Sequence, residues 1–126
     1  MFWRKKKKEV QPVNLLTLIP ERNARFEEQE NGKITLLKPR FKTAWIQQRM
    51  SRIMKHPDYK IHLDDVGSFV WKQMDGFRNV EEIGRRLKET FGEKVEPVYD
   101  RLGEFLAILD RNKFIRLRQS GEDNNA

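Results

Sequence analysis

The chain has 126 residues, which suits a single domain, and it lacks cysteine, so disulfides, thiolate metal sites and cysteine nucleophiles are excluded. Hydrophobic residues make up 37% of the chain, and their clustered, periodic placement excludes general disorder. Of the net charge of +7, Arg4–Lys8 contribute +5, which leaves 21 of the 26 bases against 19 acids in the remainder. The basic character therefore belongs largely to an N-terminal tail. The lack of cysteine fits a cytoplasmic protein, which is our expectation.

Residues 1–12 are typical of a solvated, disordered tail, because blocks of like charge repel one another. Phe2 and Trp3 stand beside the bases, a combination that suits weak contact with an acidic membrane surface, where each base adds about 1 kcal/mol. We expect a single domain over residues 13–118, with an insert at 41–56, and a second disordered tail at 119–126.

A β-hairpin is the first element that the pattern predicts, after an extended segment at Leu15–Ile19. Its strands are Arg25–Glu30 and Lys33–Pro39. The Asn31-Gly32 pair between them favours a type I′ turn, and Pro39 ends the second strand. The insert that follows has rough helical periodicity and predicts a short helix over Phe41–His56.

A third strand is predicted over Tyr59–Leu63, where apolar residues alternate with Lys60 and His62. Asp64 then suits the cap of a helix that ends at Gly76. Three further residues of the kind that starts or stops helices predict two more. These are the capping residue Asn79, the stop Gly92 and the helix-starting Pro97. Phe114–Leu117 returns as a short strand or an extended wing.

The order of elements predicts an α+β, winged-helix-like fold, with a small antiparallel three-stranded sheet followed by a three-helix bundle. Catalytic chemistry is hard to find in it. The two histidines, His56 and His62, lie on different elements, and Asp64-Asp65 is better explained as a helix cap than as a catalytic pair. We expect a binding module with no catalytic residues, no cofactor and no metal.

The third strand is a candidate sheet edge, whose free N–H and C=O groups would accept an extended peptide by strand addition. Such a peptide would also pack against one side of the third helix. Ile108 and Arg101 share one flank of it, beside the core stripe, which suits an acidic and hydrophobic ligand. The alternative is that Ile108 is a peripheral core residue.

A known family shares these residues. The stretch L-D-D-V-G-S-F-V-W-K-Q-M-D-G-F-R-N-V-E-E-I-G-R-R-L, Leu63 to Leu87, resembles the signature of the PqqD family. Phe105–Ile115 resembles the closing helix and extended end of that family, and Leu36–Pro39 resembles its strand ending in proline. The resemblance covers Ile19 to Leu117.

The resemblance implies a function. The family comprises RiPP recognition elements, small peptide chaperones that bind the leader of a ribosomally made precursor and present it to a modifying enzyme, often a radical S-adenosylmethionine enzyme. It also implies that the leader adds as a strand beside the third strand, against the third helix. Transferred here, the peptide-binding residues are Tyr59, Lys60, Ile61, His62, Leu63, Arg101 and Ile108.

Two departures from the family pattern bear on this site. The insert separates Pro39 from the third strand, where the family runs on almost directly, and it could cover the edge or extend the groove. The family also tends to carry an acid where this chain has Arg101.

Other functions stay open at this point. A winged-helix nucleic-acid binder would explain the basic tail, although Asp100, Glu104 and Asp110 make the third helix a poor match for phosphates. A structural or membrane-adjacent interaction protein is the other alternative. The exposed edge could also pair with a second copy of the chain in a homodimer.

Overall fold

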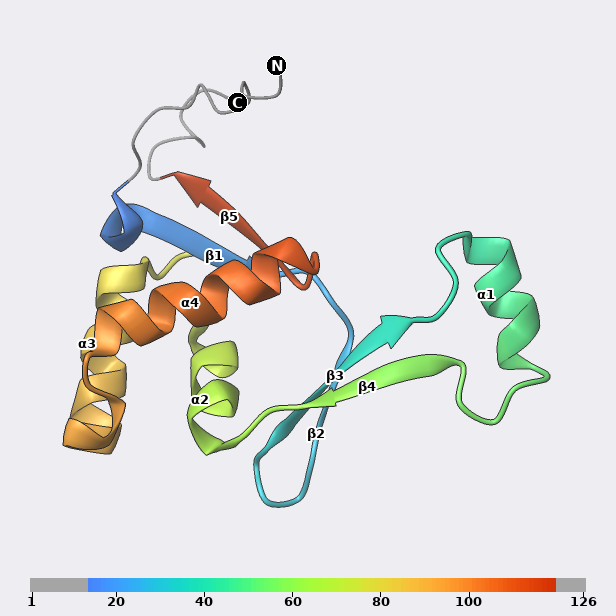
Figure 1. Cartoon of the computed structure of the whole chain (residues 1–126), viewed down its shortest axis with the longest axis horizontal. Coiled ribbons are helices and arrows are strands. Elements are labelled where there is room, and N and C mark those ends of the chain that lie inside the picture. Colours follow the sequence, from blue (N-terminus) through green and yellow to red (C-terminus); the bar gives the residue numbers. More distant parts are fainter. Residues whose placement is uncertain (1–13, 120–126) are drawn as a thin grey trace, which may run out of the picture.

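The computed structural model describes residues 14–119, and this part of the chain forms two antiparallel sheets and four α-helices (Figure 1). One sheet pairs β1 (Leu18–Arg22) with β5 (Ile115–Gln119). The other has the order β2 (Phe26–Glu28), β3 (Ile34–Pro39), β4 (Asp58–His62). The helices are α1 (Ala44–Ser51), α2 (Asp65–Gln73), α3 (Val80–Phe91) and α4 (Val98–Arg111), and short 3-10 turns lie at Leu15–Thr17 and Gly92–Val95.

The α+β class is confirmed, but the expected single sheet and three helices are incomplete. The final strand, β5, does not stand alone as a wing, because it pairs with β1 in a second sheet. The short helix expected within Phe41–His56 is present as α1, which brings the described helices to four, and a winged-helix arrangement remains a prediction. Leu15–Thr17 forms a 3-10 turn where an extended segment was expected, and Gln119 belongs to β5. The rest of both predicted tails, 1–12 and 120–126, lies outside the described residues.

The β2–β3 hairpin stands where the sequence predicts it, but the type I′ turn is wrong. The backbone N–H of Gln29 donates to Lys33 O at 2.8 Å, and that of Gly32 donates to Gln29 O at 2.9 Å. The loop therefore has three residues, and only Gly32 has a positive φ, of 87°. This is a type I turn closed by a glycine bulge, whereas type I′ needs positive φ at Asn31 as well.

The predicted starts of α2 and α3 are confirmed by their caps, but α2 ends at Gln73, with Met74 as its C-cap, and not at Gly76. The Asp64 carboxylate accepts from the backbone N–H of Gly67 at 2.8 Å, and the Asn79 side chain accepts from that of Glu82 at 2.9 Å. Gly76 and Gly92 have φ of 86° and 67°, the left-handed region that glycine enters most easily. These short-range signals set the positions of α2 and α3.

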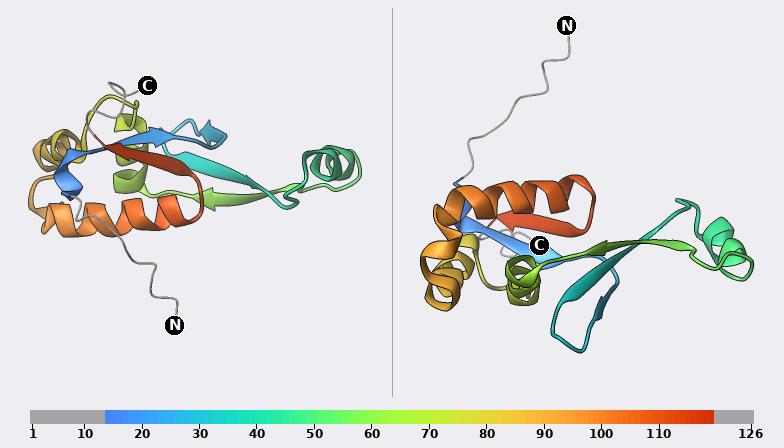
Figure 2. Two further views of the ribbon diagram at one scale, coloured as in Figure 1. Left: turned by 90° about the horizontal axis from the view of Figure 1, so that it is seen from above. Right: turned by 60° about the horizontal axis from the view of Figure 1, so that its bottom comes forward.

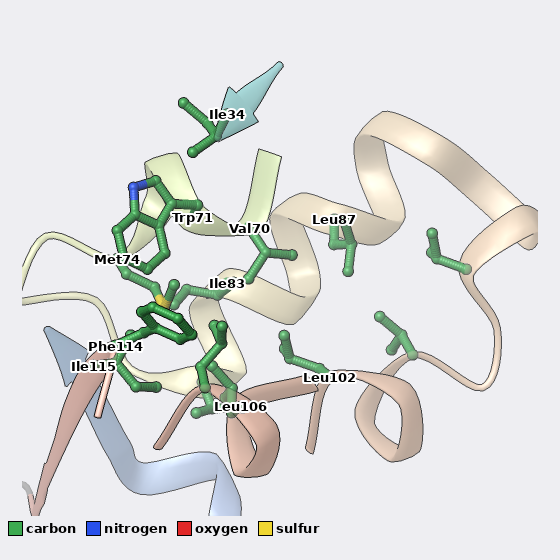
Figure 3. Packing of buried hydrophobic residues seen from close by; sticks show 14 of the residues in the cluster. Ile34, Val70, Trp71, Met74, Ile83, Leu87, Leu102, Leu106, Phe114 and Ile115 are labelled. Carbon is green, nitrogen blue, oxygen red and sulfur yellow. The ribbon is translucent and has the colours of Figure 1, made fainter. Parts of the chain in front are cut away.

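The core lies where α2, α3 and α4 meet the inner residues of β3 and β5 (Figure 3). Trp71 is wholly buried at the centre, and the Phe26 ring packs edge-on against it at 5.6 Å between centroids. Ile34 and Leu36 bring β3 into the same cluster. The sheet that carries β4 is thus fixed to the helices through β3.

The turn after α2 fastens β1 to the helices. Oδ1 of Asp75 accepts from the backbone N–H groups of Phe77 and Arg78, each at 2.9 Å, and the N–H of Gly76 donates to Pro20 O at 3.2 Å. Desolvation by burial acts to raise the pKa of Asp75, but these N–H groups and the Arg78 charge outweigh it and lower the pKa. The Asp75-Gly76 pair therefore holds the scaffold.

A close approach between α3 and α4 gives the first testable prediction. A Cβ added to Gly84 would lie 2.3 Å from Cε1 of Tyr99, whose hydroxyl donates to Glu81 O at 3.0 Å. Because the ring is held at its far end, we expect Gly84→Ala to lower the free energy of unfolding by about 1–3 kcal/mol. Urea titration followed by circular dichroism measures this. Combined with Tyr99→Leu, the same substitution should cost clearly less, and equal costs in both backgrounds would show that the ring is not the obstacle.

Candidate functional site

Strand β4 is an open edge of its sheet. It pairs with β3 on one side, and within residues 14–119 no strand lies on its other side. From Tyr59 to His62 every residue is exposed. The expected edge strand is therefore present, and it begins at Asp58, one residue before the predicted start.

The register of the sheet determines which backbone groups of β4 face the open side. The N–H of Leu37 donates to Arg25 O at 3.0 Å, toward β2, while the N–H of Leu63 donates to Ile34 O at 2.9 Å. Hydrogen-bonded pairs recur at every second residue of an antiparallel ladder, so Tyr59 and Ile61 direct their groups at β3. The N–H and C=O groups of Lys60 and His62 consequently point outward.

The two faces of β4 differ in character. Tyr59 and Ile61, 50% and 37% exposed, share a face with Lys38, whose ammonium lies 5.8 Å from the Phe114 ring centroid just beyond α4. Their side chains thus stand on the side of the sheet that faces the end of α4. Lys60 and His62 point to the opposite face, where His62 Nδ1 lies 2.9 Å from the Thr35 hydroxyl.

One flank of α4 lies at the border of the core, where Phe105 packs against the core cluster. Arg101, Phe105 and Ile108 follow one another at spacings of four and three residues, which places them in one stripe. Ile108 is 50% exposed, so it is not a core residue of the described chain. The Arg101 guanidinium donates to Lys94 O at 3.2 Å, which holds the side chain at the start of the stripe.

A pocket of about 250 Å³ lies between this flank and the start of α2, which follows β4 in the chain. Arg101 and Phe105 line it from α4, and Asp64, Val66 and Gly67 line it from the residues that follow the strand. A Cβ on Gly67 would lie 3.4 Å from the Phe105 ring, so the glycine keeps α2 and α4 close. Sequence reasoning missed this pocket, although a glycine in the first turn of a helix signals a close approach.

The structure thus divides the predicted residues among three places. Tyr59–His62 form the edge, Leu63 turns inward and packs against the core, and Arg101 and Ile108 lie on α4. Arg101 reaches the pocket beside the end of β4. Ile108 lies about two turns further along α4, toward the end that meets Lys38.

The family model described as "Coenzyme PQQ synthesis protein D (PqqD)" matches residues 52–115, half of the chain. This chain belongs to the PqqD family. The matched PqqD region contains β4, α2, α3 and α4, and therefore both the open edge and the flank described above. The resemblance noted upstream, from Ile19 to Ser51, lies outside it. No curated protein and no solved structure matches the chain.

Ser68, a residue of α2, helps to position the edge strand β4. Its buried hydroxyl accepts from the backbone N–H of Ile34 at 2.8 Å and lies 3.4 Å from Leu63 O. The N–H of Leu63 still donates to Ile34 O at 2.9 Å, so the hydroxyl takes only the place of the return hydrogen bond from Ile34 N–H and links both strands to the helix. The sequence offers only a weak signal for this role, a polar residue on the buried face of an amphipathic helix.

The insert does not cover the open edge of β4. Strands β3 and β4 extend away from α2–α4 as an arm that carries α1 at its far end (Figures 1 and 2). Gln47 anchors α1 to the arm, because its side chain accepts from Phe41 N at 3.1 Å and donates to Pro57 O at 3.0 Å. Arg40 stacks on the Tyr59 ring at 4.2 Å. The insert therefore extends the molecule beyond β4 and leaves the strand open.

Two searches of the described residues found nothing. No group of three His, Asp or Glu lies together as metal ligands in residues 14–119. No helix in the same part of the chain is long and apolar enough to cross a bilayer.

Proposed function

We propose that this PqqD-family protein is a non-catalytic adaptor that captures the leader of a ribosomally synthesised precursor peptide by strand addition to β4. The observation that carries the proposal is the open edge of β4, with the backbone groups of Lys60 and His62 directed outward, inside the matched region. The captured precursor is then presented to a modifying enzyme, for which a radical S-adenosylmethionine enzyme is the expected class. Cytoplasmic location is part of the same proposal.

The surroundings of β4 indicate the chemistry of the leader. Antiparallel addition is slightly the more stable geometry, and it would direct alternate leader side chains to the face that carries Tyr59 and Ile61. An apolar side chain at the His62 end would reach the pocket beside Phe105. The Arg101 guanidinium at that pocket favours an acidic neighbour. We therefore propose a leader that combines alternating apolar residues with an acid.

Amide hydrogen exchange tests the proposal residue by residue. The probe is a synthetic leader peptide of the chemistry proposed above, with alternating apolar residues and an acid. We expect saturating leader to slow exchange at the N–H groups of Lys60 and His62 at least about tenfold, because each gains a hydrogen bond. The N–H groups of Tyr59 and Ile61 are already directed at β3 and should change much less.

The alternation is the control, because nonspecific binding or general stabilisation would slow all four amides alike. Unchanged exchange at Lys60 and His62 under saturating leader would contradict strand addition at this edge. The predicted homodimer through the same edge is separated by dilution, since protection from a second copy depends on protein concentration and needs no leader.

A further inference from the structure

Helix α1 and the turn that follows it present exposed apolar side chains and bases on one face. Trp45 and Ile53 are 65% and 72% exposed, and a shallow depression is lined by both together with Arg49 and Arg52. The spacing of Trp45, Arg49 and Arg52 places them on the side of the helix opposite Gln47, which is bonded to the arm. We call Trp45, Arg49, Arg52 and Ile53 the tip face. Within residues 14–119, this face has no packing partner.

The tip has an uncompensated positive charge. No Asp or Glu occurs between Asn31 and Pro57, whereas five bases lie in the insert and its flanks, namely Arg40, Lys42, Arg49, Arg52 and Lys55. Among the described residues, the last four of these bases form no ion pair. An acidic surface would therefore be attracted to the tip without first displacing an internal partner.

We propose that the tip face docks on an anionic lipid bilayer, with the Trp45 ring and Ile53 entering the interface and the bases meeting the phosphate headgroups. Tryptophan prefers the interfacial region, and each nearby base multiplies the affinity about fivefold. Ile53 favours a bilayer over a nucleic acid as the acidic partner. An aliphatic side chain gains binding free energy from contact with acyl chains, and gains little from phosphates or stacked nucleobases. The docking does not depend on peptide capture.

The place of α1 in the fold suits a flat surface. The helix lies at the end of the arm, away from α2, α3 and α4, so a bilayer would meet it without meeting them (Figure 2). One such patch gives weak, reversible attachment, and stable anchoring needs two. The sequence contains a second set of the same composition, Phe2 and Trp3 beside Arg4–Lys8.

Flotation of the full chain with vesicles tests the proposal. We expect binding to vesicles of phosphatidylglycerol and phosphatidylcholine, and none to phosphatidylcholine alone. Replacing Arg49 and Arg52 together by Gln should weaken the binding about 25-fold, from about fivefold for each base. Replacing Trp45 and Ile53 together by Ala should weaken it about tenfold.

Matched variants elsewhere on the surface separate the tip face from net charge. The pair Lys94→Gln and Arg111→Gln removes the same charge from exposed positions, and Phe77→Ala removes a side chain that is 82% exposed. Both controls should bind within about twofold of the parent chain. Equal losses in the tip and control variants would overturn the proposal, and so would tip variants that bind like the parent chain.

Fluorescence supplies a second measurement. In a Trp3→Phe chain, Trp45 is the exposed tryptophan and Trp71 is buried, so anionic vesicles should shift the emission to the blue and lipid-borne quenchers should reduce it. A single-stranded RNA oligonucleotide is the competing probe. If RNA binds through Arg49 and Arg52 while vesicles leave Trp45 unchanged, the tip is a nucleic-acid site and the membrane proposal is wrong.

Discussion

Replacing Lys60 by proline is expected to weaken leader binding about 100-fold while leaving the fold intact. The Lys60 N–H points away from β3, so proline removes no rung of the existing sheet. It does remove a donor that an added strand would need, and it leaves a leader carbonyl unpaired against the proline ring. Together these losses amount to about 3 kcal/mol, or about two orders of magnitude in the dissociation constant.

Isothermal titration with the synthetic leader measures this effect, and Lys60→Ala is the matched control. Alanine removes the same side chain but keeps the N–H, so we expect only a severalfold loss. A thermal melt of each variant should lie close to that of the parent chain. Leader binding that survives Lys60→Pro would place the peptide elsewhere, whereas equal losses in both variants would assign the effect to the ammonium group.

Replacing Trp71 by alanine is expected to lower the free energy of unfolding by about 3–5 kcal/mol, a large part of the total of about 5–15 kcal/mol for a domain of this size. The ring is wholly buried between the helices and β3 (Figure 3). It also packs edge-on against the Phe26 ring. Its Nε1 has no hydrogen-bond partner among the described residues. Trp71→Phe should therefore cost only about 1 kcal/mol, since it removes an unpaired donor together with part of the packing.

Urea titration followed by circular dichroism compares these variants without depending on tryptophan emission. Trp45→Ala makes the same chemical change at an exposed position and should stay within about 0.5 kcal/mol of the parent chain. A Trp71→Phe variant as unstable as Trp71→Ala would mean that the indole N–H has a partner after all.

The parts of the fold that sequence could predict are those set by neighbours in the chain. Asp64 and Asn79 cap their helices through groups only three residues away, and the β4 strand follows from its own alternation. The turn type at Asn31-Gly32 could not be predicted from sequence, because it depends on whether Glu30 belongs to the loop or pairs in the β2–β3 strand ladder. The β1–β5 pair was missed because its strands lie at opposite ends of the chain and Pro20 disfavours a strand.

The candidate site divides in the same way. The edge and the α4 flank, with Arg101 and Ile108, could be placed from periodicity and from the family resemblance. The outward direction of Lys60 and His62 could not, because it follows from the register between β3 and β4 and so from residues far apart in the chain. Ser and Gly have low helix propensity, so the sequence alone gives no reason for Ser68 and Gly67 in α2. The reason is the hydrogen bond between Ser68 and Ile34 and the close approach of Gly67 to Phe105, which only the fold shows. The position of α1 depends on the length and course of the arm, which no local pattern encodes.

The pairing of β1 with β5 has a consequence for how this domain could be combined with others. Leu18 and Gln119 are direct partners across the two strands, so the described chain enters and leaves its fold at one place. Such a domain can be inserted into a loop of another protein, or closed into a circle and reopened elsewhere, with little strain. Because β4 and α1 belong to the other sheet and its arm, both would remain accessible in such a fusion. The fold is in this sense suited to insertion into another protein as an independent domain.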